Sequence, residues 1–405
     1  MKKVRLGQMI EVQRGYDLPK NKTIPGPYPV VTSTSISAYH REYKAEDTIV
    51  IGRSGTVGNP RVVRGKFWPL NTTLFATDLK ENDMDYMCYL LSNLHLEKLV
   101  TGSTVPTLNR NDIYLLEVPV ETDVSKQKKI GALLKTIDSK VYNNEAIAQQ
   151  LESMAKTIYN YWFLQFEFPN EEGNPYKSSG GKMVWNEELQ RDIPEGWEVG
   201  NISSLIDSKK NGDWGKENMQ GNYVLPVSCI RGADIDFVNG KSLSTPPTRF
   251  ILEKNSSKLL KPYDFVIEIS GGSPTQSTGR IAGISSYLFS RFNNEIVCSN
   301  FCKAITLKDK VNYYYFLQTW MTLFENDVMF NWEGKTSGIK NLMFDSFVKN
   351  TKVVIPNKEQ LNMFFELSDS IEYKIQNMLK QNQELLSLRD FLLPLLMNGQ
   401  VTVGE

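Results

Sequence analysis

One apolar pattern occurs twice in this chain, and its second copy lies 234 residues after the first. In both copies the apolar positions alternate steps of four and three residues, which predicts a long helix that packs against another long helix. A duplicated unit of this length predicts two similar bodies related by a pseudo-two-fold axis. The residues expected at the coiled-coil interface are Ile130, Leu134, Ile137, Val141, Asn144, Leu151 and Ile158 in the first copy and Phe364, Ile371, Ile375, Asn382, Leu385 and Leu392 in the second.

Each copy of the pattern predicts a helix that is too long for the core of one globular domain. A helix of about 35 to 40 residues spans roughly 55 to 60 Å, so its apolar stripe needs a second long helix as partner. The other copy supplies that partner, and the pseudo-symmetry makes the pair antiparallel. Asn144 is then expected opposite Asn382, where two buried amides would fix the register of the pair.

The sequence also marks the ends of the two helices. Ser125 is the expected N-cap of the first helix. Asn357, with Gln360 three residues later, predicts a capping box for the second helix, and Asn398-Gly399 predicts its end.

The segments that flank the helices repeat as well. Val4-Arg5-Leu6-Gly7 is echoed by residues 197–200, and each half then runs through short β-like stretches cut by Gly, Pro, Asn and Asp. Residues 167–196 are rich in Gly, Pro, Ser and acidic residues, which predicts a surface connection. We therefore expect an α+β fold with two mixed α/β domains separated by two long antiparallel coiled-coil helices. The expected segments are the first domain (1–122), the first long helix (123–165), a linker (166–196), the second domain (197–355) and the second long helix with a C-terminal tail (356–405).

The charges of the chain are balanced overall but unevenly distributed. The 46 Lys and Arg residues equal the 46 Asp and Glu residues in number. Residues 1–80, however, carry thirteen basic against six acidic side chains, and residues 201–310 carry fourteen against ten. Such segregation predicts a basic face on each domain, which suits double-stranded DNA as a partner. Scattered surface charge is the alternative interpretation.

Composition narrows the other possibilities. No run approaches the roughly 18 apolar residues of a membrane span, so we expect no membrane partner. The first residues lack the apolar region of an export signal, which predicts a cytoplasmic protein. Four cysteines in so long a chain predict no disulfide framework, and their spacing, with two distant histidines, predicts no metal site.

Two glycine-rich loops are the best candidates for ligand contact. An apolar strand leads into Gly52-Arg53-Ser54-Gly55-Thr56-Val57-Gly58, and residues 266–280 repeat the order of strand, glycines, hydroxyls and arginine. Glycine lets the backbone approach a partner, while Arg, Lys, Asn and hydroxyl side chains contact phosphates or base edges. Each loop alone is also typical of a plain hairpin turn. The candidate DNA-binding residues are Thr32, Ser33, Thr34, Arg53, Ser54, Thr56, Arg61, Arg64, Lys66 and Asn71 in the first half and Ser228, Arg231, Ser270, Gln276, Ser277, Thr278, Arg280, Arg291 and Asn300 in the second.

The sequence gives no basis for naming a catalytic residue. It lacks the N-P-P-F or D-P-P-Y motif of amino-methyltransferases and the Walker A motif of nucleotide hydrolases. Glu333-Gly334-Lys335 and Glu372-Tyr373-Lys374 match the loose E-x-K pattern of nucleases, which is expected by chance in a chain of this length. We therefore assign no catalytic role.

Several motifs together resemble the specificity (S) subunits of type I restriction-modification systems. They are K-V-R-L-G at the start, I-V-I-G-R-S-G-T-V-G in the first domain, V-P-T-L-N-R-N-D-I before the first helix, Q-K-K-I within it, and the linker P-N-E-E-G-N-P-Y-K-S-S-G-G-K-M-V-W-N-E-E-L followed by I-P-E-G-W. The resemblance covers essentially the whole chain. The second copy departs from it, because residues 340–347 replace the L-N-x-x-D-I block and its glycine loop is longer.

The resemblance implies a non-catalytic subunit with two target-recognition domains, each of which reads one half of a bipartite asymmetric DNA target. It also implies that the helices set the spacer between the halves and dock two methyltransferase subunits, while restriction subunits join in the full complex. The assembled complex would act as a DNA adenine methyltransferase and an ATP-dependent endonuclease. S-adenosylmethionine, ATP and Mg would then be bound by the partner subunits, and no cofactor by this chain. A self-sufficient DNA-acting enzyme, such as a nuclease, and a coiled-coil structural adaptor are the alternatives.

Overall fold

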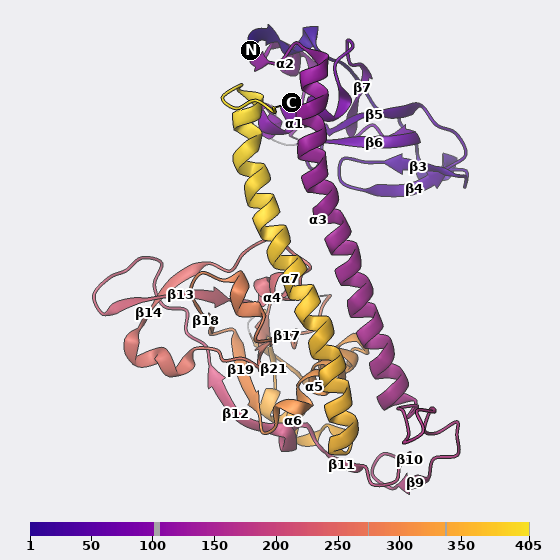
Figure 1. The fold of residues 1–405 in the computed structure, drawn as a ribbon, viewed down its shortest axis with the longest axis vertical. Coiled ribbons are helices and arrows are strands. Elements are labelled where there is room, and N and C mark those ends of the chain that lie inside the picture. The colour runs from indigo at the N-terminus through magenta and orange to yellow at the C-terminus, as the bar shows by residue number, and fades with distance from the viewer. Residues whose placement is uncertain (101–105, 274, 337, 405) are drawn as a thin grey trace. The chain divides into compact units, whose positions relative to one another are not determined.

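The computed structural model describes residues 1–100, 106–273, 275–336 and 338–404 (Figure 1). Val105, which begins the V-P-T-L-N-R-N-D-I motif, lies outside the described residues. The chain divides into two compact units, and the division passes through both long helices. The first unit contains residues 1–143 and 382–405, and the second contains residues 144–381. Each unit therefore combines one mixed domain with one part of each long helix.

The domain of the first unit is built on a sheet with the strand order β2-β7-β5-β6-β3-β4. The long strand β6 joins two parts of this sheet, because its residues 58–67 pair with β5 antiparallel and its residues 68–69 pair with β3 parallel. A separate pair, β1 with β8, lies outside this sheet. The elements are β1 (Lys2–Arg5), β2 (Glu11–Arg14), β3 (Tyr28–Val31), β4 (Ile36–His40), β5 (Ala45–Gly52), β6 (Gly58–Pro69), β7 (Thr73–Asp78), α1 (Met84–Asn93), α2 (Arg110–Leu115) and β8 (Glu117–Val120).

The domain of the second unit contains two sheets in place of one. Their strand orders are β12-β19-β15-β17 and β14-β13-β18. A small additional sheet has the order β16-β21-β20. The elements are β11 (Glu198–Asn201), β12 (Ile206–Asn211), β13 (Tyr223–Ile230), α4 (Ile235–Val238), β14 (Thr248–Leu252), β15 (Asp264–Glu268), β16 (Ser270–Gly271), β17 (Ile281–Ile284), β18 (Glu295–Cys298), β19 (Cys302–Leu307), α5 (Tyr313–Glu325), β20 (Glu333–Thr336), β21 (Ile339–Leu342), α6 (Phe344–Asn350) and β22 (Lys352–Ile355).

The strand orders confirm the internal repeat. The order β12-β19-β15-β17 repeats β2-β7-β5-β6, and the pair β11–β22 repeats β1–β8. The parallel pair β13–β18 repeats the pairing of β3 with the far end of β6. The one strand β6 thus corresponds to two strands, β17 and β18, which is why one sheet in the first domain corresponds to two in the second. Both copies share a frame that the second has elaborated.

The two predicted long helices are α3 (Val124–Tyr159) and α7 (Lys358–Met397), and their first residues also differ by 234. In the first unit, Ile130 and Leu134 of α3 lie in one core with Leu396 of α7. In the second unit, Ala148 of α3 packs with Leu379 of α7. Because early residues of α3 meet late residues of α7, the helices are antiparallel in each unit, as the seam predicts (Figure 1).

The predicted ends of α7 agree with the structure better than the predicted start of α3. The N-cap prediction for α3 is wrong, since Asp123 accepts the backbone N–H of Ser125 at 2.8 Å and the helix begins at Val124. Asn357 does cap α7, because its side chain accepts the N–H of Gln360 at 3.2 Å. The predicted capping box is incomplete, since the side-chain oxygen of Gln360 has no hydrogen-bond partner among the described residues. Gly399 ends α7 in the left-handed conformation, with φ of 70°, as the sequence predicts.

Both seam asparagines are buried and hydrogen-bonded within their own units. In the second unit, Asn144 donates to the side chain of Gln381 at 2.8 Å. In the first unit, Asn382 donates to the backbone carbonyl of Val141 at 3.4 Å. A direct pairing of Asn144 with Asn382 would join the two units and stays a prediction.

The linker is more than the surface connection that its composition predicts. Phe166 and Phe168 at its start, and Ile193 near its end, are buried in the core of the second domain. Between them lie the strands β9 (Met183–Asn186) and β10 (Arg191–Pro194), which form a hairpin. The average composition of the segment is polar because of its middle residues, so it does not predict that the apolar residues near its ends are buried. None of the described helices has the length and apolar content of a membrane-spanning segment.

A substitution pair tests the seam. Leu134→Ala should lower the free energy of unfolding of the first unit by about 2 to 5 kcal/mol, because it empties a fully buried position. Leu133→Ala removes the same atoms from a neighbouring side chain that is 37% exposed and should change this free energy by about 0.5 kcal/mol or less. Denaturant unfolding monitored by circular dichroism measures both. Equal losses in the two variants would contradict the assigned face of α3.

Candidate nucleic-acid interface

The first glycine-rich loop connects β5 to β6 and is held on both sides by backbone hydrogen bonds. A Cβ atom at Gly52 would lie 2.0 Å from the carbonyl oxygen of Thr56, so this position requires glycine. The N–H of Arg53 donates to the carbonyl of Thr72 at 2.8 Å, and the N–H of Leu108 donates to the carbonyl of Arg53 at 2.9 Å. The loop therefore has a fixed place between the β6–β7 turn and the L-N-x-x-D-I block.

The same two backbone hydrogen bonds occur in the second domain, with different residues. The N–H of Ile269 donates to the carbonyl of Phe301 at 2.9 Å, and the N–H of Leu342 donates to the carbonyl of Ile269 at 2.9 Å. Ile269 therefore takes the place of Arg53. Phe301 takes the place of Thr72. The shared frame thus carries polar residues in one domain and apolar residues in the other.

Arg280 has a structural role that the sequence does not reveal. Its Nε and Nη2 each donate to the carboxylate of Glu268 at 2.9 Å, and its Nη1 lies 3.5 Å from Asp236. Arg280 does not occupy the position that corresponds to Arg53, which Ile269 takes. The longer loop turns Arg280 back onto β15, the strand that precedes it, where it neutralises a buried carboxylate.

Several predicted contact residues of the first domain already have partners within it. Arg61 donates to the backbone carbonyls of Thr32 and Ser33, and burial lowers the pKa of its guanidinium. Arg64 forms two hydrogen bonds with Asp85, at 2.9 and 3.0 Å. Ser33 is buried, so its hydroxyl does not lie at the surface. Arg53 donates to the carbonyl of Asn71 at 3.5 Å, and the side-chain amide of Asn71 donates to Asp17. Apart from Arg61 and Arg64, the predicted residues that are exposed or half-buried are Thr32, Thr34, Arg53, Ser54, Thr56, Lys66 and Asn71.

Several predicted contact residues of the second domain hold that domain together. Arg291 donates to the carbonyl of Phe237 at 2.8 Å and to the side chain of Gln376 on α7 at 3.0 Å, and burial lowers its pKa to about 10. Arg231 forms two hydrogen bonds of 2.8 Å with Asp234. The buried members of the predicted set are Ser228, Ser277 and Thr278. Gln276 and Asn300 are exposed, and Ser270 is half-buried and donates to the side chain of Asn341 at 2.5 Å.

The structure adds Phe301, which sequence reasoning missed. Its side chain is 58% exposed at the turn between β18 and β19, directly after Asn300. Large aromatic residues are usually buried, and nothing in the sequence marks this one as exposed. Only the backbone hydrogen bonds that align this turn with the β6–β7 turn identify its position.

Comparisons with known proteins show what this chain is similar to. Residues 1–153 match the family model described as the type I restriction modification DNA specificity domain. The specificity subunit of the type I restriction enzyme MjaIX from Methanocaldococcus jannaschii is 26% identical over 374 residues, which covers 88% of this chain and 78% of that protein. The first 153 residues therefore resemble a type I DNA specificity domain, and most of the chain is similar to a type I specificity subunit. These subunits are not the catalytic members of their systems.

A solved specificity subunit has the same fold. The crystal structure of the S subunit of a type I restriction-modification system from M. genitalium aligns with a TM-score of 0.63 at 16% identity. The alignment covers 98% of this chain and 96% of that one. The fold of this chain is therefore similar to the fold of that S subunit.

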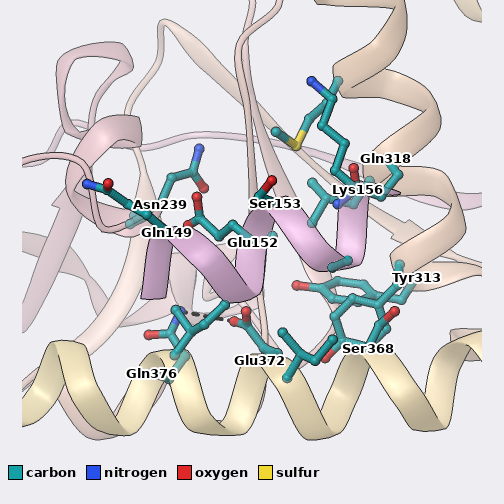
Figure 2. Close-up of a pocket in the computed structure, with 18 of the residues that line it drawn as sticks. Gln149, Glu152, Ser153, Lys156, Asn239, Tyr313, Gln318, Ser368, Glu372 and Gln376 are labelled. Atoms are coloured by element: carbon teal, nitrogen blue, oxygen red, sulfur yellow. Dashed lines mark hydrogen bonds between the residues drawn. The ribbon is translucent and has the colours of Figure 1, made fainter. Parts of the chain in front are cut away.

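A cavity of about 340 Å³ lies where the second domain meets the two helices within the second unit. Figure 2 shows Glu152 of α3 and Glu372 of α7 on facing sides of it. Glu372 accepts a hydrogen bond from Gln376 at 2.9 Å. Among the described residues, no group of three or more His, Cys, Asp and Glu side chains is arranged to hold a metal ion.

The two carboxyl groups of this cavity have raised pKa values. Burial raises the pKa of Glu372 above its ordinary value of 4.5, while the hydrogen bond from Gln376 and the charge of Arg291 oppose the shift. Burial also raises the pKa of Glu152, with Lys241 opposing it and Glu372 adding to it. Each group therefore binds a proton more tightly in the folded chain than in the unfolded chain.

This linkage predicts a pH dependence of stability. Because the folded pKa of Glu372 lies above the unfolded value, its contribution is lost as the pH rises from about 4.5 through the folded pKa. Glu372→Gln should therefore reduce the fall in the free energy of unfolding of the second unit as pH rises. Glu366→Gln, at an exposed position of the same helix, is the control. Denaturant unfolding between pH 4.5 and 8 measures the effect, and identical slopes for wild type and Glu372→Gln would contradict it.

Proposed function

We propose that this chain is the DNA sequence-recognition subunit of a type I restriction-modification complex. Each domain reads one half of a bipartite, asymmetric DNA target through the surface around its glycine-rich loop. The chain itself supplies recognition and positioning, while methylation and cleavage belong to other subunits. Two findings support this function: the similarity to specificity subunits and the presence of two related domains that each pack on the two long helices.

One observation carries the proposal. The two domains hold their loops with the same backbone hydrogen bonds, yet Arg53 in one corresponds to Ile269 in the other. Backbone hydrogen bonds fix where a side chain stands, whereas the side chain determines which base edge it suits. A conserved frame with different side chains is what two readers of two different half-sites need. The basic surplus of residues 1–80 and 201–310 adds attraction to phosphates.

The long helices suit the role of spacer and docking surface. The 36 residues of α3 extend over about 54 Å, and this length is independent of the loops that read DNA. Outside the seam, α3 carries a second set of exposed apolar residues at heptad positions, Leu133, Ile147 and Met154, and α7 repeats two of them as Leu367 and Leu388. Exposed apolar side chains in register mark a partner surface. We propose that two methyltransferase subunits dock there.

The remaining parts of the system follow from this assignment. The methyltransferase subunits would bind S-adenosylmethionine and modify adenine, and restriction subunits would bring ATP and Mg for ATP-dependent cleavage. We assign no residue of this chain to the binding of S-adenosylmethionine, ATP or Mg. A complex that acts on DNA of its own cell places this subunit in the cytoplasm.

The function is tested by reconstitution. The chain co-expressed with its methyltransferase should bind random duplex DNA with an affinity that falls steeply as salt rises, because phosphate contacts release counterions. Gel shifts at salt concentrations from about 50 to 200 mM would measure this fall, with the complex at roughly micromolar concentration, where nonspecific binding is detectable. An intact complex that binds no duplex at low salt would refute the assignment.

The arginine of the first loop gives a sharper prediction. Arg53→Ala should cost about 1 to 3 kcal/mol of binding to the cognate target and relax specificity in one half-site only, if Arg53 contacts a base edge. Arg53→Lys is the matched control, since it keeps the charge and loses the bidentate geometry. Competition binding with single-base variants of the target measures both. A loss that is equal for all sequences, and that Arg53→Lys restores, would make Arg53 a phosphate contact instead.

A further inference from the structure

The turn between β18 and β19 and the turn between β6 and β7 are built alike. The N–H of Cys302 donates to the carbonyl of Ser299 at 3.0 Å, and the N–H of Thr73 donates to the carbonyl of Leu70 at 2.9 Å. An asparagine follows the first residue of each turn, Asn71 in one and Asn300 in the other. The two turns therefore present their side chains from equivalent places in the two domains.

The third residue of the turn and the loop residue bonded to it have changed together. In the first domain they are Thr72 and Arg53, and in the second they are Phe301 and Ile269. Ile269 is partly buried and packs against the core of the second domain, so it does not extend outward as an arginine can. Phe301 is the side chain that projects at this place, with 58% of its surface exposed. An apolar surface thus replaces a cationic one.

We propose that Phe301 reads the second half-site by packing against the 5-methyl group of a thymine in the major groove. The proposal rests on the proposed function, because it requires this face to meet DNA. The thymine methyl is the apolar feature of a base edge in that groove, and phenylalanine is one of the side chains that contact it. The side-chain amide of Asn300, the preceding residue, has the N–H donor that suits N7 of adenine and the oxygen acceptor that suits its N6 amino group.

Reading of a base edge fits the turn better than insertion between base pairs. Apolar wedges that unstack bases act from the minor groove and kink the duplex. The equivalent turn of the first domain carries Asn71 and Thr72, whose side chains are too short and polar to act as wedges. Since both domains share the frame, both turns face the same feature of DNA. The shared frame therefore favours a contact of Phe301 with a base edge.

The first experiment locates the contact. Long-read sequencing of methylated adenines in cells that express the chain with its methyltransferase gives the target of the wild type and of Phe301→Ala. The variant should lose its preference at one T·A pair, in the half-site that Arg53→Ala leaves unchanged. An unchanged motif, or a second half-site without a T·A pair, would overturn the proposal.

The second experiment removes the methyl group alone. The purified methyltransferase complex is titrated with the cognate duplex carrying either thymine or deoxyuridine at the identified position. Loss of the methyl should weaken binding by the wild type about fourfold, the fold-change that corresponds to one buried methylene-sized group. Phe301→Ala should bind both duplexes equally, and Phe301→Leu should keep part of the difference. Equal sensitivity of wild type and Phe301→Ala to deoxyuridine would overturn the proposal.

Two controls separate the possible failures. Tyr39→Ala removes an aromatic side chain of similar exposure, 56%, from the first domain and should leave the deoxyuridine effect intact. Wild-type complex that binds no duplex would instead refute the proposed function. A duplex with 2-aminopurine beside the thymine reports unstacking, and brighter fluorescence with wild type than with Phe301→Ala would identify a wedge and overturn the edge contact.

Discussion

Each domain completes its hydrophobic core with side chains from both long helices, and the rest of the structure depends on this packing. In the first unit, Leu134 of α3 and Leu396 of α7 lie in the same core as the strands. In the second unit, Tyr159 of α3 and Phe364 of α7 do so. Because cores are close-packed, a change in the helix pattern disturbs both the pair and the domain. The seam therefore keeps a constant offset, while the exposed loops are free to differ.

The contact between domain and helix shows how the copies diverge within one frame. In the first unit, Asp85 of α1 accepts a hydrogen bond from Lys135 of α3 at 2.9 Å. In the second unit, Tyr314 of α5 donates to Asp369 of α7 at 2.7 Å. Lys135 and Asp369 are 234 residues apart. Both residues of the pair differ between the two units, so the contact between α1 and α3 is chemically different from the contact between α5 and α7.

The sequence predicts the frame well because periodicity is a property of many residues. The two long helices follow from the spacing, their antiparallel order from the pseudo-symmetry and the α+β class from the β-like stretches, and the structure confirms all three. The residues that contact DNA are harder to predict from the sequence, because a residue's type does not show whether its side chain binds another residue of the same chain. Nothing in the sequence indicates that Arg280 donates to Glu268 at 2.9 Å or that Arg291 donates to the carbonyl of Phe237 at 2.8 Å. Phe301 carries no signal until backbone bonds align it with Thr72.

The central claim is that one shared frame carries two different readers. Long-read sequencing of methylated adenines, in cells expressing the wild-type chain with its methyltransferase, tests this claim most directly. The account predicts one motif made of two unlike half-sites separated by a fixed number of unspecified base pairs. A symmetric motif with identical halves, or one continuous motif without a gap, would contradict it.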